Sequence, residues 1–312
     1  MTQSAIPSSG PGALAWMLLL TLGVIWGSSF MLTNIAVIEV PPVTLSALRL
    51  ALAAVLIGAA VVMTGGRLPR LKGDGRLWRF AFLSAVLGNV LPFCLISWSQ
   101  LHIPSALTGI LMAPMPLVSL FLAHLMLAGE RMTTGRFVGF FIGLGGLVIL
   151  IGGDALSGVE GSGLALLGQI ASLVAMLCYA LNGIALKRAA APDPLGISFA
   201  ILTLAALIAV PLALIVEAPV LADYSASAWI TVGALGLGAT ALAQIILMKI
   251  IDLAGPPFLA TVNFQVPLWA TVFGVVFLGE ILPETFWIAL GLILLGLAIA
   301  QFAGRLGTTR NM

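Results

Sequence analysis

The chain has 312 residues, of which 61% are hydrophobic and only 8% are Asp, Glu, Lys or Arg. A soluble globular protein is about 25% charged, and a soluble fold of this length could not cover its surface with so few polar groups. The composition therefore excludes a soluble enzyme, a nucleic-acid-binding protein, a disordered chain and a secreted disulfide scaffold, and leaves an integral membrane protein.

Ten apolar runs, separated by short connections, follow one another along the chain. A membrane-spanning helix needs about 20 predominantly apolar residues. Because the backbone must satisfy its own hydrogen bonds in hydrocarbon, the runs are expected to be helices, which makes the fold all-α. We predict the spans at residues 13–35, 42–64, 78–99, 104–128, 136–152, 163–186, 195–217, 228–250, 257–279 and 285–304.

The basic residues indicate the orientation of these spans. With the N-terminus in the cytoplasm, the inner connections and the tails carry 12 of the 13 Lys and Arg residues, and the outer connections carry none. Cytoplasmic segments of membrane proteins are enriched in Lys and Arg. We therefore expect a multi-pass protein of the inner or plasma membrane with both termini cytoplasmic, whose net charge of +2 implies no nucleic-acid partner.

The second half of the chain repeats the order of the first. A shift of 151 residues superposes spans three and four on spans eight and nine, so that Trp78 falls on Trp229. Five spans is an odd number, so the second repeat must lie upside down relative to the first. Secondary transporters often have such inverted repeats, with the substrate near the midplane. A duplicated bundle without transport is the alternative. The predicted repeats are residues 1–158 and 159–312.

Three motifs resemble those of a known family. Trp26–Phe30 is similar to its W-G-S-x-F opening, Pro42 followed by Arg49 to its P-x6-R pattern, and the Gly-Glu pairs at 129–130 and 279–280 to its repeat ends. By these motifs the whole chain resembles the EamA branch of the drug/metabolite transporter superfamily. The resemblance implies ten helices in two inverted five-helix repeats and export of amino acids or related metabolites. The subgroup it points to is the YddG-like exporters of aromatic and neutral amino acids.

Arg49 is the one clear ionisable residue well inside a predicted span, about 12 Å from its outer end at 1.5 Å per residue. Such a residue is a functional-site hypothesis, since its guanidinium could bind a substrate carboxylate. The structural alternatives are an outward-pointing side chain, a pair with Glu39, and bonds to helix carbonyl groups. Its counterpart in the second repeat is Ile201.

No Asp or Glu lies deep in a predicted span. Proton-coupled transporters commonly use buried carboxylates or His. The sequence therefore disfavours proton-coupled export of cationic drugs, and transport driven by the substrate gradient is expected. No cofactor or metal is implied.

Neutral polar, Met and aromatic residues form stripes at helical spacing within several spans. Such a mixture suits a central cavity that receives a small-molecule zwitterion, whereas interhelical hydrogen bonding is the alternative use. The cavity candidates are Trp26, Asn89, Thr108, Met112, Tyr179, Asn182, Thr240, Gln244, Asn263 and Trp269.

Pro116 and Pro267 lie within spans at matching repeat positions and are hinge candidates for alternating access. Glycines four residues apart predict close helix packing, either within a monomer or at a homodimer seam. These glycines are Gly23 and Gly27 in the first span, and Gly135, Gly139 and Gly143 in the fifth.

The function expected from these features is secondary transport, by an exporter or facilitator of small metabolites in the lipid bilayer, most of all amino acids including aromatic ones. Export of drugs, nucleosides or sugar-lipids is the alternative within this class. An intramembrane enzyme would need a nucleophile and a base at membrane depth, for which only Cys94 or Cys178 with His124 is available, and no catalytic motif is present. A channel is a further alternative.

Overall fold

The computed structural model describes residues 11–66, 75–127, 129–130, 132–156, 163–187, 193–220 and 223–308. Within these ranges the chain forms ten membrane-length helical spans and no strand, which confirms the fold class predicted from the apolar runs. The spans of the first half are α1 (Ala13–Ala36), α2 (Pro42–Thr64), α3 with η1 and α4 (Gly75–Ala85, Val86–Val90, Leu91–Ser99), α5 with α6 (Ser105–Met112, Met115–Met126), and α7 (Thr134–Leu156). Those of the second half are α8 (Gly163–Lys187), α9 (Pro194–Val216), α10 with η3 and α11 (Ala226–Gly233, Ala234–Leu242, Ala243–Ala254), α12 with α13 (Pro256–Leu259, Val262–Leu278), and α14 (Glu284–Thr308).

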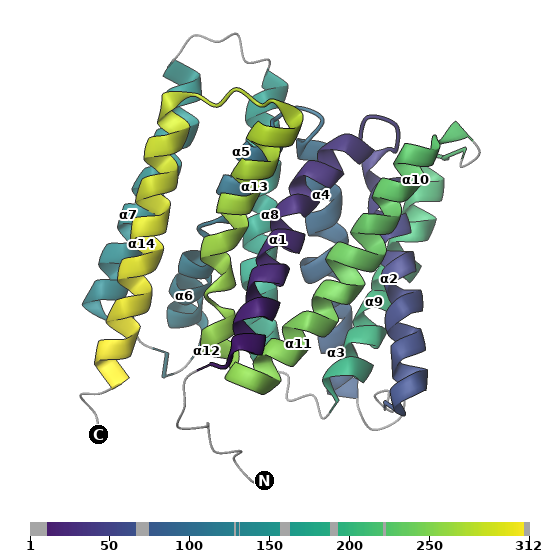
Figure 1. The fold of residues 1–312 in the computed structure, drawn as a ribbon, viewed down its shortest axis with the longest axis horizontal. Coiled ribbons are helices and arrows are strands. Elements are labelled where there is room, and N and C mark those ends of the chain that lie inside the picture. Colours follow the sequence, from purple (N-terminus) through teal and green to yellow (C-terminus); the bar gives the residue numbers. More distant parts are fainter. Residues whose placement is uncertain are drawn as a thin grey trace.

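The spans stand side by side, and α1 begins at the side of the bundle where α14 ends (Figure 1). We call this the inner side, following the distribution of basic residues. Some helices continue beyond the predicted ends at this side. Thus α3 begins at Gly75 instead of residue 78 and includes Arg76, and α11, which contains Lys249, continues to Ala254 instead of residue 250. Long charged side chains at helix ends can reach the membrane surface, so these residues do not end the helix.

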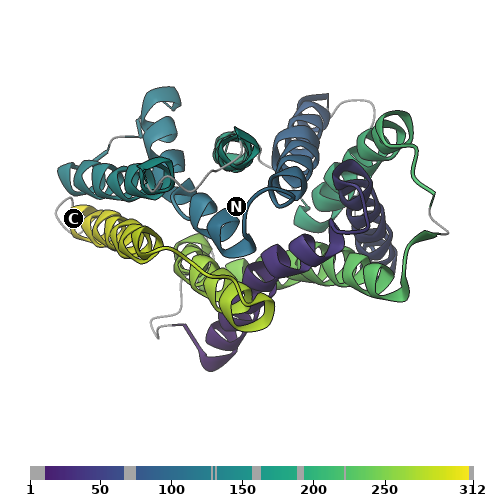
Figure 2. The same cartoon turned by 90° about the horizontal axis from the view of Figure 1, so that it is seen from above.

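The packing of the spans has the two-fold pattern of a repeat. The second span packs along the seventh (α2 with α9), and the fifth along the tenth (α7 with α14). These two pairs lie at opposite ends of the molecule, with the remaining helices between them (Figure 2). Contacts of α1 with α13 are matched by contacts of α8 with α5 and α6. Each helix thus has an equivalent neighbour in the other half.

Glycines allow two of these contacts to be close. A Cβ atom at Gly139 would collide with the backbone of Gly296 in α14, and one at Gly27 would collide with Trp269 in α13. Gly23 and Gly143 likewise lie against side chains of other helices of the same chain. The predicted small-residue steps therefore serve packing within the chain at these four positions.

The third and eighth spans each contain a π-helical segment at equivalent positions, η1 (Val86–Val90) and η3 (Ala234–Leu242). In η1 the Asn89 Nδ2 atom donates a hydrogen bond to the Ser84 carbonyl, at 3.0 Å. In η3 the Thr240 Oγ1 atom donates to the Leu235 carbonyl, at 2.9 Å. Both bonds reach five residues back, and both donors and both acceptors are 151 residues apart, the repeat offset in the sequence. Such π turns occur frequently at functional sites.

The two candidate hinge prolines occupy different settings. Pro116 lies in the first turn of α6, directly after the break between α5 and α6. Pro267 lies inside the continuous helix α13, and the ninth span is interrupted one to two turns earlier, between α12 and α13. Proline fits the first turn of a helix without losing a hydrogen bond, whereas it removes one from a helix interior.

Glutamates cap three helices that begin at the outer side. Glu217 accepts backbone N–H bonds of 2.7 and 2.9 Å from the first turn of α2, and Glu280 accepts bonds of 2.6 and 2.9 Å from that of α5. Glu39 accepts bonds from the backbone N–H and the hydroxyl of Ser225 before α10, which hold the pKa of its carboxyl below the usual 4.5. The free N–H groups at a helix N-terminus favour such anions. All three contacts join the two halves of the chain.

Candidate substrate cavity

A cavity of about 430 Å³ lies between the two halves of the chain. Residues from spans one, two, three, four, six, eight and nine line it, as expected for a site at a repeat interface. Its lining includes eight of the ten cavity candidates: Trp26, Asn89, Met112, Tyr179, Asn182, Thr240, Gln244 and Asn263.

Thr108 and Trp269 are the two candidates that the structure does not bring into this lining. Thr108 is fully buried in α5, where its hydroxyl donates to the Pro104 carbonyl at 3.2 Å. Trp269 lies on α13 at its close contact with Gly27, and its ring is 6.0 Å from that of Phe273. Their neighbours Gly109 and Pro267 do line the cavity, so Thr108 and Trp269 differ from the lining residues in the face of the helix that they occupy.

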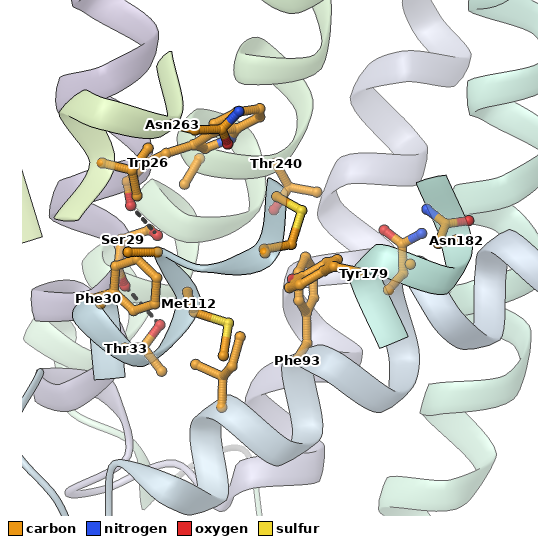
Figure 3. Close-up of a pocket in the computed structure, with 18 of the residues that line it drawn as sticks. Trp26, Ser29, Phe30, Thr33, Phe93, Met112, Tyr179, Asn182, Thr240 and Asn263 are labelled. Atoms are coloured by element: carbon orange, nitrogen blue, oxygen red, sulfur yellow. Dashed lines mark hydrogen bonds between the residues drawn. The ribbon is translucent and has the colours of Figure 1, made fainter. Parts of the chain in front are cut away.

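Several lining residues were not among the candidates. In α1, Ser29, Phe30 and Thr33 follow Trp26 at intervals of three and four residues, so this helical stripe was readable from the sequence. Aromatic side chains enclose the space: Tyr179 and Phe93 lie close together, across the cavity from Phe30 (Figure 3).

Arg49 also lines the cavity. Its Nε atom donates a 2.7 Å hydrogen bond to Thr240 Oγ1, and its guanidinium carbon lies 3.9 Å from the centre of the Phe93 ring. The expected alternative of a pair with Glu39 is wrong, because Glu39 bonds Ser225 instead. The Thr240 hydroxyl, which donates to the Leu235 carbonyl of η3, therefore connects Arg49 of α2 to the π-helical segment of the other repeat.

The cavity carries a net positive charge. Arg49 is the one charged side chain among the described residues that line it, and no described residue accepts a hydrogen bond from its two terminal NH2 groups. Asn182 adds an amide whose Oδ1 atom is buried without a hydrogen-bond partner among the described residues, whereas the Gln244 amide donates to Ser198 Oγ at 3.2 Å. An unpaired guanidinium in a mostly apolar enclosure is a strong attractor of carboxylate or phosphate oxygens.

The cavity is closed toward the outer side. There the Asn34 amide donates to the Gln100 carbonyl at 3.2 Å, and the hydroxyls of Ser99 and Ser172 share a 2.7 Å hydrogen bond. Ser99, Gln100 and Ser105 are buried. Toward the inner side, the central cavity meets a second cavity of about 570 Å³, with which it shares Met115, Gly183 and Asn263. The central cavity thus continues toward the side of the bundle at which α1 begins.

Ten spanning helices with a two-fold arrangement, around a cavity closed on one side, define a membrane transporter. The model of the EamA-like transporter family matches residues 13–152 and again residues 166–301. The chain belongs to this family of the drug/metabolite transporter superfamily.

Known relatives agree with this class. The inner membrane transporter YedA of Escherichia coli is 27% identical over 282 residues, which is 90% of this chain and 88% of YedA. A "probable terminal-alkyne amino-acid exporter" of Streptantibioticus cattleyicolor is 29% identical over 135 residues, 43% of each chain. One solved crystal structure matches with a TM-score of 0.65 and 22% identity, over 93% of this chain and 98% of its own, and shares the fold. With its ten membrane-length helices the chain is a multi-pass membrane protein, and these relatives are named as transporters.

Proposed function

We propose that the protein carries amino acids, including aromatic ones, across the membrane by alternating access, driven by the substrate gradient alone. The observation that supports this proposal is one arginine whose terminal N–H groups have no acceptor among the described residues. The other described residues of the cavity lining are neutral, and several are aromatic or Met side chains. A zwitterionic amino acid offers a carboxylate to the arginine, and its ammonium group and side chain suit the neutral polar, aromatic and Met lining. The relative named as a probable amino-acid exporter fits the same substrate class.

The roles of the cavity residues follow from their chemistry. Arg49 would bind the substrate carboxylate, and Thr240 would hold the guanidinium in place. The ammonium group would bind neutral acceptors such as the unpaired Asn182 carbonyl oxygen. Tyr179, Phe93 and Met112 would contact the substrate side chain, because thioether and aromatic groups adapt to varied shapes.

Alternating access would use the two-fold construction. We propose that the Pro116 break, Pro267 and the paired segments η1 and η3 bend as the inner side closes and the outer side opens. The glutamate caps and the bond between Asn34 and Gln100 close the outer side in the inward-facing state. We further propose that both termini are cytoplasmic, from the distribution of basic residues, and that one chain suffices for transport, as a monomer or within a homodimer.

Counterflow in proteoliposomes tests the site. Radiolabelled L-phenylalanine should enter vesicles preloaded with unlabelled substrate, with saturable kinetics. Tyr179→Ala and Gln244→Ala should abolish or strongly weaken this uptake, since both side chains line the cavity. Tyr224→Ala is the matched control, because Tyr224 is the other tyrosine of the chain and is not among the residues that line the cavity. Full activity in both cavity variants would contradict the proposed site.

A further inference from the structure

The second cavity, of about 570 Å³, opens from the central one toward the inner side, between α6, α8, α12 and α14. Leu117, Leu120, Phe264 and Leu297 make most of its wall apolar. Arg136, in the first turn of α7, is the one charged side chain among its described lining residues.

Arg136 has no partner for its charge in the part of the chain that the structure describes. Its Nε atom is buried without a hydrogen bond, and no ion pair or hydrogen bond of the guanidinium to a described residue is present. The one bond recorded for Arg136 is from its backbone N–H to Thr133 Oγ1, at 3.4 Å. A basic residue at the inner side can set the membrane orientation without lying in a cavity, so topology alone does not explain the position of Arg136. A buried, unpaired N–H of a cation costs free energy that an anionic oxygen would recover.

We infer that this inner cavity is a loading subsite, in which Arg136 binds the carboxylate of a substrate that arrives from the inner side, before the carboxylate moves on to Arg49. The inference rests on the proposed function for the identity of the substrate. The path is continuous, because Met115, Gly183 and Asn263 line both cavities.

Arg49 and Arg136 together select against cations along the path. Neither cavity has a carboxylate among its described lining residues, and each has one arginine. The field of two successive cations raises the local concentration of anionic groups and repels amines that lack a carboxylate. The phosphate of an anionic lipid offers the same chemistry as a carboxylate, so the experiment must separate the two sources.

Protection of Arg136 from phenylglyoxal tests the subsite directly. The full chain is placed in nanodiscs of phosphatidylcholine, and the rate of adduct formation at each arginine is followed by mass spectrometry. We expect benzoate and L-phenylalanine to slow the modification of Arg136, and phenylethylamine to leave it unchanged. Arg79, which is exposed on α3 outside both cavities, is the internal control. Protection should persist in Arg49→Gln, because the subsite does not require Arg49.

Transport kinetics supply the second readout. Arg136→Gln should lower kcat/KM for L-phenylalanine about tenfold, because one charge-assisted hydrogen bond is lost. Arg136→Lys should retain part of the wild-type kcat/KM, and Arg79→Gln should retain all of it. The inference would be overturned if benzoate did not protect Arg136, or if protection appeared only after phosphatidylglycerol was added. Counterflow by the wild type would in that case still support the proposed function. Protected Arg136 in a protein without amino-acid counterflow would overturn the proposed function and leave an anion site.

Discussion

Replacing Thr240 by valine tests whether Arg49 must be held in place to bind substrate. The substitution keeps the shape of the side chain but removes the hydroxyl that accepts the 2.7 Å bond from Arg49 Nε and donates the 2.9 Å bond to the Leu235 carbonyl. A hydrogen bond to a charged group contributes about 1.5–3 kcal/mol. If that free energy orients the guanidinium toward the substrate, its loss should weaken substrate affinity at least about tenfold.

Thr231→Val is the matched control. Thr231 is buried in α10, in the same span, and its hydroxyl donates to the Ser227 carbonyl at 2.8 Å, but it contacts neither Arg49 nor the cavity. Both variants should lose about 1 kcal/mol of stability through the backbone bond. The KM of L-phenylalanine counterflow should rise only in Thr240→Val. An equal KM in the two variants would refute a positioning role for Thr240.

Three further predictions concern the packing and the outer caps. Gly139→Ala should destabilise the protein by about 1–3 kcal/mol in detergent melts, because the new methyl group would meet the backbone of α14, whereas Gly145→Ala, with open space around it, should not. Glu280→Ala should cost about 0.5–2 kcal/mol through loss of the α5 cap. The Glu39 pKa is lowered in the folded state, so its contribution is complete above pH 4.5 and disappears as the pH falls through the lowered pKa. Glu39→Ala should accordingly melt below the wild type at pH 7, with a smaller difference at pH 3.

The spans were predictable because hydrocarbon imposes a length and an apolar composition that a single sequence displays. The eight candidates that line the cavity stand out in the sequence because polar and aromatic side chains recur on one face of otherwise apolar helices. Thr108 and Trp269 lie beside lining residues of the same spans, but Thr108 is fully buried and Trp269 packs against Gly27. Helical spacing groups residues on one face, but the packing of the neighbouring helices decides which of these residues reach open space.

The π-helical segments were not predictable for a related reason. Asn89 and Thr240 are ordinary polar residues of apolar spans in the sequence, and their bonds to carbonyls five residues back exist only once the helix has widened. Arg136 shows another limit. It is one of 12 basic residues that the sequence places at the inner side, and its place in a cavity depends on how α6, α8 and α14 pack around it.

The most direct test of a cavity that carries carboxylate-bearing amino acids without ion coupling is a paired counterflow measurement. Proteoliposomes containing the wild-type protein, with a protonophore present, are offered radiolabelled L-phenylalanine or radiolabelled phenylethylamine, which differ by the carboxylate. The account predicts saturable counterflow of L-phenylalanine, none of phenylethylamine, and loss of the L-phenylalanine signal in Arg49→Gln. Counterflow of the amine, or uptake of the amino acid only under an imposed proton gradient, would contradict it.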